Sequence, residues 1–323
     1  MRRPARPSPR TALARGLLAG AVLDALVPDP RRGHPVALFG AGAAALERGV
    51  YRDSRTAGAG YAVLCTGAAV AAGRVLRRAG VAGVAAATWV VLGARSLRAE
   101  GRAVHAHLLA GDLPAAREQL THLVGRNTAE LPAGEIARAV VESLAENTCD
   151  AVVAPLFWGA VAGVPGLLGY RAANTLDAMV GHRSPRYARF GWAAARLDDL
   201  ANWVPARLSA VSVALAASLA GGCARRSLAT ALRDGRRHPS PNGGWPEAAF
   251  AGALGVRLGG RNSYGERVEH RPVLGDGRPV EVADLPQAVR LCATAAAVSA
   301  LAAAVLADRG VWWSRREQNP PRS

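Results

Sequence analysis

Four charged residues near the middle of the chain are spaced so that they could act together. Glu135, Arg138, Glu142 and Glu146 are three or four residues apart, which places them on one face of a helix. Asn147 and Asp150 follow immediately, just before a long apolar run. A charged helix face is usually only solvated, but hard oxygen ligands of this kind are also those that Mg²⁺ prefers. We predict a functional site here.

A second polar segment, residues 171–207, lies between two apolar runs. It crowds together Asn174, Asp177, Arg196, Asp198, Asp199, Asn202 and Arg207. Two interpretations stay open. The charges form an exposed ion cluster of little energetic worth, or carboxylates hold Mg²⁺ while arginines clamp phosphate oxygens.

Glycine-rich polar sequence fills residues 225–289, including Ser240, Asn242 and Gly243. Such loops can bind phosphate through backbone N–H groups, but the sequence has no GxxxxGK[ST] motif. A flexible, turn-rich connector is the plainer expectation. Near the start, His34 lies in a proline-rich stretch and is a candidate proton carrier or phosphate ligand.

Long uncharged runs must position these polar segments. They cover residues 16–27 (interrupted by Asp24), 56–73, 79–94, 151–170, 208–224 and 291–307. A helix that crosses a membrane needs roughly 20 predominantly apolar residues, so we predict an all-α, polytopic membrane helical bundle with about five to six spans. A soluble alanine-rich bundle is the alternative. Pro155 and Pro165 predict that 151–170 is kinked or re-entrant.

We expect residues 1–323 to form a single integral membrane domain. Its polar parts are a basic N-terminal tail (1–15), a polar segment of three helices (95–150), the Gly/Pro-rich segment (225–289) and a C-terminal tail (308–323). The net charge is +16, and the chain has 40 arginines and no lysine. The charge forms no single stripe and aromatic residues are scarce, so we expect no nucleic-acid partner. Four scattered cysteines exclude a disulfide scaffold.

Five stretches together resemble the adenosylcobinamide-phosphate synthase (CobD/CbiB) family of cobalamin biosynthesis. They are Asp-Pro-Arg and His-Pro-Val within 29–36, Gly-Arg-Asn-Thr-Ala-Glu-Leu at 125–131, Glu-Ser-Leu-Ala-Glu-Asn-Thr-Cys-Asp at 142–150 with Ala-Pro-Leu-Phe-Trp at 154–158, the motifs within 171–208, and Ser-Pro-Asn-Gly-Gly-Trp-Pro-Glu-Ala-Ala at 240–249. The similarity extends from about residue 17 to about residue 307. One departure is Asn127, where many relatives carry Asp, so Asn127 is not a candidate catalytic residue.

The resemblance implies a multi-pass enzyme of the inner cell membrane. Such an enzyme joins adenosylcobyric acid to (R)-1-amino-2-propanol phosphate, or to the free aminoalcohol, with hydrolysis of ATP. ATP and Mg²⁺ would then be required, the corrinoid would be a substrate, and no tightly bound organic cofactor is expected. Membrane lipid and other membrane enzymes of the pathway are the expected partners.

This chemistry suggests roles for the candidates. Glu142, Glu146, Asn147 and Asp150 are predicted as the catalytic cluster, and Asp177, Asp198 and Asp199 as metal ligands. The predicted substrate and phosphate ligands are His34, Asn174, Arg196, Asn202, Arg207, Ser240, Asn242, Gly243 and Arg257. Two other functions stay open: a non-enzymatic carrier or scaffold for corrinoid intermediates, and a membrane signalling protein of the AmpE type.

Overall fold

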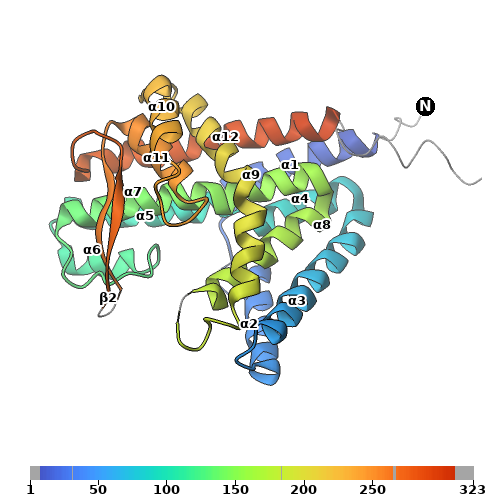
Figure 1. Cartoon of the computed structure of the whole chain (residues 1–323). Coiled ribbons are helices and arrows are strands. Elements are labelled where there is room, and N and C mark those ends of the chain that lie inside the picture. Colours follow the sequence, from blue (N-terminus) through green and yellow to red (C-terminus); the bar gives the residue numbers. More distant parts are fainter. Residues whose placement is uncertain (1–7, 31, 183, 265–266, 310–323) are drawn as a thin grey trace, which may run out of the picture. The chain divides into compact units, whose positions relative to one another are not determined.

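The long apolar runs form helices in the computed structural model, which describes residues 8–30, 32–182, 184–264 and 267–309. Four helical segments are long and apolar enough to cross a membrane: Arg55–Leu109, Ala133–Gly181, Trp192–Ala217 and Val282–Arg309. The first contains α3 (Arg55–Leu76), α4 (Gly80–Val91) and α5 (Ala94–Leu109). One apolar segment can therefore contain more than one helix that crosses the membrane. The predicted helical membrane bundle is confirmed (Figure 1).

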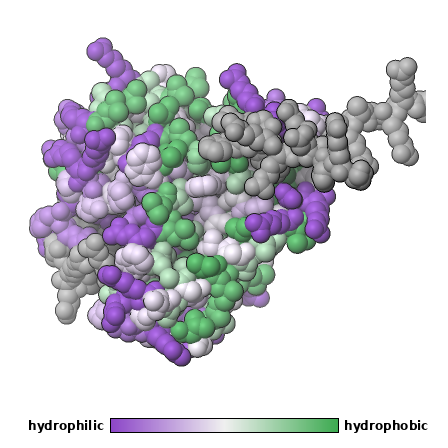
Figure 2. All heavy atoms as spheres, turned by 45° about the vertical axis from the view of Figure 1, so that its right-hand side comes forward, coloured by the Kyte–Doolittle hydropathy of each residue, from purple (hydrophilic) through white to green (hydrophobic). Residues whose placement is uncertain are grey.

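Helix α9 (Trp192–Ala217) carries an exposed apolar stripe. Leu200, Val204, Leu208, Val211 and Leu215 recur every three or four residues and are all exposed. Figure 2 shows patches of hydrophobic residues on one face, between residues of intermediate and low hydropathy. A stripe of this length would be costly in water, whereas in a bilayer it contacts lipid.

The described chain divides into two compact units, each built from separate stretches of sequence. Unit 1 comprises 1–92, 155–198 and 300–323, and unit 2 comprises 93–154 and 199–299. Unit 1 contains α1 (Pro9–Leu26), α2 (Pro35–Val50), α3, α4 and most of α8 (Ala154–Leu176). Unit 2 contains α5, α6 (Leu113–Leu120), α7 (Ala133–Thr148), α10 (Ala224–Asp234) and α11 (Gly244–Leu254). Helices α9 and α12 (Leu285–Arg309) contribute residues to both units.

Glycines bring the helices of unit 1 into close contact. A Cβ atom on Gly16 would lie 2.4 Å from Cβ of Val84, and one on Gly20 would lie 2.3 Å from Cβ of Thr88. Because 16 pairs with 84 and 20 with 88, α1 and α4 run parallel. Small residues let helix backbones approach in this way inside a membrane, where tight packing replaces the hydrophobic driving force.

Helix α8 reverses direction at Gly163. This residue has φ 65°, and a Cβ on Gly166 would lie 2.2 Å from the carbonyl oxygen of Trp158. Residues eight apart in a straight helix are about 12 Å apart, so the two halves of α8 must fold back on each other. The expected kink in 151–170 is therefore confirmed, and its physical cause is a glycine in the left-handed region two residues before Pro165.

Unit 2 is built around α7. Ile136, Val140 and Leu144 have no exposed surface and belong to one apolar core with Phe250 of α11 and Leu285 of α12. The three helices predicted in 95–150 are present as α5, α6 and α7. Asp112 caps α6 by accepting a hydrogen bond from the Ala115 N–H group at 3.0 Å, which explains the break after α5.

The expectation of a flexible connector in 225–289 is wrong. The segment contains α10, the fully buried α11, and an antiparallel hairpin of β1 (Leu258–Tyr264) and β2 (Arg267–Leu274). Positive φ angles at Gly259 and Gly260 create an irregularity in the strand register. This bulge interrupts the alternation by which a strand is recognised in sequence.

The predicted tails are shorter than expected or lie outside the described residues. Helix α1 begins at Pro9 with Ser8 as its cap, within the expected N-terminal tail 1–15. Helix α12 continues to Arg309, into the expected C-terminal tail 308–323. Residues 1–7 and 310–323 lie outside the part of the chain that the structure describes.

Two glycines of α3 provide a matched test of this packing. A Cβ on Gly58 would lie 1.7 Å from the carbonyl oxygen of Phe190, whereas one on Gly60 would meet nothing within 4 Å. We expect Gly58→Ala to destabilise the protein by about 1–3 kcal/mol through overpacking. Gly60→Ala should leave the thermal unfolding midpoint in detergent unchanged or slightly raised. Equal midpoints for the two variants would contradict this packing.

Candidate functional site

Glu142 of α7 is the centre of a buried ion cluster in unit 2. Its Oε1 accepts hydrogen bonds from Arg138 Nη1 at 2.8 Å and from the Gly259 N–H group at 2.9 Å. Its Oε2 accepts one from Arg126 Nη2 at 2.8 Å. The Glu142 side chain is only 8% exposed. Arg138 also pairs with Glu135, so the predicted shared helix face is confirmed.

This bonding makes Glu142 an anchor for arginines. Three donors occupy most of the lone-pair directions of this carboxylate, and two of them are cationic arginines, which disfavours a metal ion beside it. The carboxylate ties together the loop before α7, α7 itself and strand β1, because Arg126, Arg138 and Gly259 belong to those three segments. A buried ion cluster of this kind is stable only while all of its partners are present, because an unpaired buried charge is strongly destabilising.

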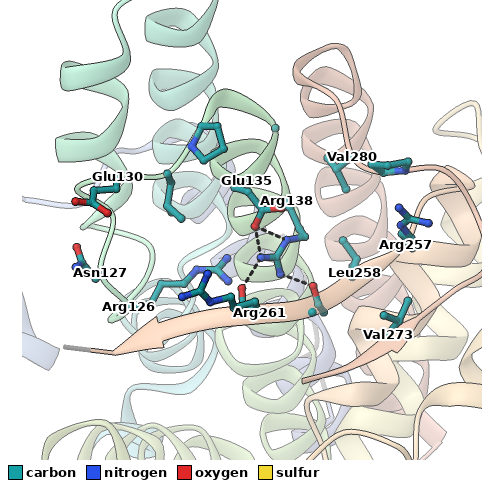
Figure 3. Close-up of a pocket in the computed structure, with 16 residues that line it drawn as sticks. Arg126, Asn127, Glu130, Glu135, Arg138, Arg257, Leu258, Arg261, Val273 and Val280 are labelled. Atoms are coloured by element: carbon teal, nitrogen blue, oxygen red, sulfur yellow. Dashed lines mark hydrogen bonds and ion pairs between the residues drawn. The ribbon is translucent and has the colours of Figure 1, made fainter. Parts of the chain in front are cut away.

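The two anchored arginines line a cavity of about 770 Å³. Figure 3 shows Arg126, Arg138 and Arg261 close together, with Arg257 beyond Leu258. The rest of the wall comes from the loop before α7, the start of α7, the two strands and the segment after them. These residues are Asn127, Glu130, Leu131, Pro132, Gly134, Glu135, Gly259, Gly260, Val273, Pro279 and Val280.

The cavity is electropositive. Arg257 and Arg261 are exposed, and neither has an acidic partner among the residues that the structure describes. Of the two lining acids, Glu135 is paired with Arg138, and Glu130 is exposed. Guanidinium groups offer planar, paired donors that match phosphate and carboxylate oxygens. The cavity can therefore bind an anion, and its volume admits a small organic phosphate or a nucleotide.

A buried acid lies beside this cluster. Glu247 of α11 is 1% exposed, and its Oε1 has no hydrogen-bond partner. Burial, together with the charges of Glu142 and Glu146, raises the pKa of Glu247 well above its usual range. His238 Nε2 lies 3.7 Å from Glu247 Oε1. Burial, and then the charge of Arg271, lowers the pKa of His238 to about 4. His238 is therefore neutral at pH 7, and burial favours the protonated, neutral form of Glu247.

The other predicted catalytic residues follow Glu142 toward the apolar run. Glu146 is exposed, and its charge acts on Glu247. Asn147 donates its amide to the Ser143 carbonyl oxygen at 2.9 Å. Asp150 is half-buried in a short π-helical turn that joins α7 to α8. Of the predicted catalytic cluster, Glu146 is the exposed carboxylate.

The predicted phosphate ligands of unit 2 fall into two groups. Arg257 lines the arginine cavity. Arg207 instead stacks between the rings of Trp203 and Trp245, at 4.4 and 4.9 Å from their centroids. Arg207 also donates to Asn242 Oδ1 at 3.1 Å, and Asn242 donates to the Asp199 carbonyl oxygen at 2.8 Å.

A turn of the 240–249 motif organises this second group. The Ser240 hydroxyl accepts the N–H groups of Asn242 and Gly243, both at 3.2 Å. The buried Asn202 faces Cys149 Sγ at 3.9 Å. These bonds stabilise the turn and the adjoining part of α9.

The remaining candidates belong to unit 1. Asn174 donates to Asp198 Oδ1 at 3.2 Å, and Asp177 begins the π-helical turn after α8. Arg196 lies on α9. His34 caps α2 by accepting the Val36 N–H group at 3.3 Å, and its Nε2 lies 3.7 Å from Asp29.

No group of three or more His, Cys, Asp or Glu residues positioned to hold a metal ion occurs among the described residues. The proposed metal ligands Asp177, Asp198 and Asp199 are thus not gathered into a site made by protein side chains alone. Mg²⁺ commonly takes only one or two carboxylates and completes its shell with water and phosphate oxygens. The metal ligand set stays a prediction.

Four residues of the site are absent from the predicted catalytic, metal and phosphate ligands: Arg126, Arg138, Arg261 and Glu247. Two of them lie inside motifs already recognised, Arg126 within 125–131 and Glu247 within 240–249. Arg138 was placed on the correct helix face but only as part of a charge row. Arg261 gave no signal because the strand that carries it was not predicted.

Removal of the Glu142 charge tests its anchoring role. We expect Glu142→Gln to cost about 3 kcal/mol, because Arg126 and Arg138 would remain buried with their counter-charge removed. The matched control is Glu135→Gln, on the same helix and bound to the same Arg138, whose side chain is 43% exposed. It should cost less than about 1 kcal/mol. Equal shifts of the thermal midpoint would refute the assignment.

Glu247 should make stability depend on pH. The pKa of the carboxyl is higher in the folded protein than in the unfolded chain, so the folded state holds this proton more tightly, and stability falls as pH rises above the usual pKa of a glutamate. Glu247→Gln removes this linkage. We expect the thermal unfolding midpoint of Glu247→Gln to rise progressively above that of the wild type as the pH increases from 5 to 8. A difference that does not vary with pH would mean that the carboxyl is ionised in the folded state.

Comparison with known proteins identifies the family of the chain. A family model described as CobD/Cbib protein matches residues 17–292. The chain is 52% identical over 299 residues to a cobalamin biosynthesis protein CobD of Mycobacterium tuberculosis. The aligned residues make up 91% of this chain and 96% of the relative. A protein of the same name from Rhodobacter capsulatus is 47% identical, covering 78% of this chain and 83% of the relative.

A third such protein, from Geobacter metallireducens, is 44% identical over 303 residues, covering 90% of this chain and 95% of the relative. No solved structure matches the chain. The family match takes in both units and every predicted site residue. The chain therefore belongs to the CobD/CbiB family.

Proposed function

We propose that this protein is an ATP-dependent amide ligase of the inner cell membrane. It would join adenosylcobyric acid to (R)-1-amino-2-propanol phosphate, or to the free aminoalcohol, and release adenosylcobinamide phosphate or adenosylcobinamide. Family membership supports the broader role in cobalamin biosynthesis. ATP and adenosylcobyric acid are substrates in this proposal, and other membrane enzymes of the pathway are its expected partners.

The observation that carries the proposal is the arginine-lined cavity of unit 2. Both ATP and aminopropanol phosphate present phosphate oxygens, and a ligase of this kind must hold at least one of them while charge moves. Arg126 and Arg138 are fixed in place by Glu142, so they need little reorganisation when an anion arrives. Arg257 and Arg261 are exposed and can close on the ligand.

The reaction would proceed in two steps, activation of the carboxylate and formation of the amide. A substrate carboxylate oxygen attacks the γ-phosphorus of ATP, which forms an acyl phosphate and releases ADP. The amine nitrogen then attacks the acyl carbon, the C–N bond forms, the C–O bond to phosphate breaks, and inorganic phosphate leaves. The arginines would stabilise the negative charge that is transferred in both steps.

The second step also requires a proton acceptor. The attacking amine must lose a proton, and Glu146 is the exposed carboxylate of the α7 face. We assign proton acceptance to Glu146 and the anchoring of arginines to Glu142. Asn147 and Asp150, which follow on the same segment, remain candidates for orienting the amine.

Mg²⁺ is part of the proposal only as the partner of the nucleotide. The described residues offer no protein-only cluster of three ligands, so the ion would arrive with the phosphate groups of ATP and neutralise part of their charge. Glu130, an exposed acid of the cavity wall, is a candidate protein ligand.

Amide formation can be measured directly in detergent. Purified protein is supplied with adenosylcobyric acid, Mg-ATP and either aminopropanol phosphate or free aminopropanol, and the product is detected by mass spectrometry. Reactions without ATP or without amine are the controls. We expect ATP-dependent product. No product from a preparation shown to be folded and to bind corrinoid would favour a carrier.

Three variants test the assigned roles. We expect Arg257→Gln to lower kcat/KM by about 10- to 100-fold, the effect of losing one hydrogen bond to a charged group. Glu146→Gln should abolish amide formation without altering the unfolding midpoint, because the side chain is exposed. Arg102→Gln, an equal charge change on the exposed face of α5, should have normal activity. Normal turnover by Glu146→Gln would exclude its role.

A further inference from the structure

A second cavity, of about 680 Å³, lies in unit 1, remote in sequence from the arginine cavity. It is lined by residues from α1, the turn between α3 and α4, the reversal of α8 and the end of α12. The lining residues are Ser8, Pro9, Arg10, Ala12, Leu13, Arg77, Arg78, Gly80, Val84, Ala162, Gly163, Val164, Pro165 and Ala307. Nothing in the proposed reaction uses it.

Every segment that lines this cavity is at a helix end or a reversal. Helix α3 ends at Leu76 and α4 begins at Gly80, α1 begins at Pro9, α8 reverses at Gly163, and α12 ends at Arg309. Helices α3, α8 and α12 belong to segments long and apolar enough to cross a membrane. Common ends of such helices lie where the hydrocarbon gives way to lipid head groups.

Three arginines make this cavity positive. Arg10, Arg77 and Arg78 line it, and no acid among the described residues does. None of the three has an acidic partner among the described residues. The nearby Asp308 accepts a hydrogen bond from Thr11 at 3.2 Å. Helices α1 and α4 begin at this cavity, whereas α3 and α12 end there, so the helix dipoles largely offset one another. The guanidinium groups therefore set the electrostatic potential of the cavity.

The rest of the wall is apolar. Leu13, Val84, Val164, Pro165 and Ala307 face the same cavity as the arginines. A free phosphate ion would pair with the guanidinium groups and leave these side chains uncovered. A phospholipid would satisfy both surfaces, because its phosphate reaches the arginines while its glycerol and upper acyl carbons cover the apolar wall.

We propose that this cavity is a binding site for the phosphate head group of an anionic phospholipid. The occupant is a phosphodiester at the head-group level of the bilayer, held by Arg10, Arg77 and Arg78. The site is independent of the ligase reaction, so failure of one proposal leaves the other standing.

Binding of short-chain lipid to the purified full-length protein tests the proposal. Dihexanoyl phosphatidylglycerol is titrated into protein in a neutral detergent, and occupancy is followed by native mass spectrometry and thermal unfolding. Dihexanoyl phosphatidylcholine and inorganic phosphate are titrated in parallel. We expect saturable binding of one phosphatidylglycerol, with weaker binding of both comparison ligands.

The variants separate this site from general attraction to a basic protein. Arg77→Gln/Arg78→Gln should weaken phosphatidylglycerol binding on the order of 30-fold, and Arg10→Gln should weaken it on the order of 5-fold. Arg48→Gln/Arg52→Gln, an equal charge change on exposed residues around the other end of α3, should stay within about twofold of wild type. Unaltered unfolding midpoints without lipid confirm that each variant is folded.

Three results would overturn the proposal. Equal affinity for phosphatidylcholine would remove the preference for an anionic lipid. Inorganic phosphate that saturates at the same concentration as phosphatidylglycerol would identify a free phosphate site. Unchanged binding by Arg77→Gln/Arg78→Gln would locate the lipid elsewhere.

Discussion

The buried carboxylate of Glu142 is the interaction on which unit 2 depends. It accepts hydrogen bonds from two arginines and a strand amide, and so joins the loop before α7, α7 and the β-hairpin. Burial makes each bond strong and makes the loss of any partner costly. The same bonds fix Arg126 and Arg138 at the wall of the arginine-lined cavity. Stability of the unit and preorganisation of the site therefore have one physical cause.

The chain has arginine but no lysine, and the structure uses properties that lysine lacks. Arg138 bonds two carboxylates and two backbone carbonyl oxygens, Arg207 lies between two tryptophan rings, and Arg186 stacks 4.1 Å above Tyr51. A planar guanidinium with five donors can stack and form several hydrogen bonds at once, whereas an ammonium group is a point charge. Some of these arginines thus serve packing, and others line the two cavities.

Small residues allow the rest of the fold. Alanine and glycine give weakly apolar helices, but they let α1 approach α4 and let α8 turn back on itself at Gly163. The packing energy lost with large side chains is recovered by close contact between backbones. The same reversal of α8 helps to form the cavity of unit 1.

Local pattern was enough to predict the helical membrane class, the three helices of 95–150, the kink in 151–170 and the shared face of Glu135, Arg138 and Glu142, because these depend on spacing along one helix. The family followed from five ordered motifs. Local pattern failed for the β-hairpin, whose glycine bulge conceals the alternation, and for Arg261 and Glu247, whose importance depends on residues far away in sequence. Whether a carboxylate is paired with arginines, exposed, or buried with a raised pKa depends on the residues that surround it. Glu142, Glu146 and Glu247 are chemically identical, and long-range packing gives them three different environments.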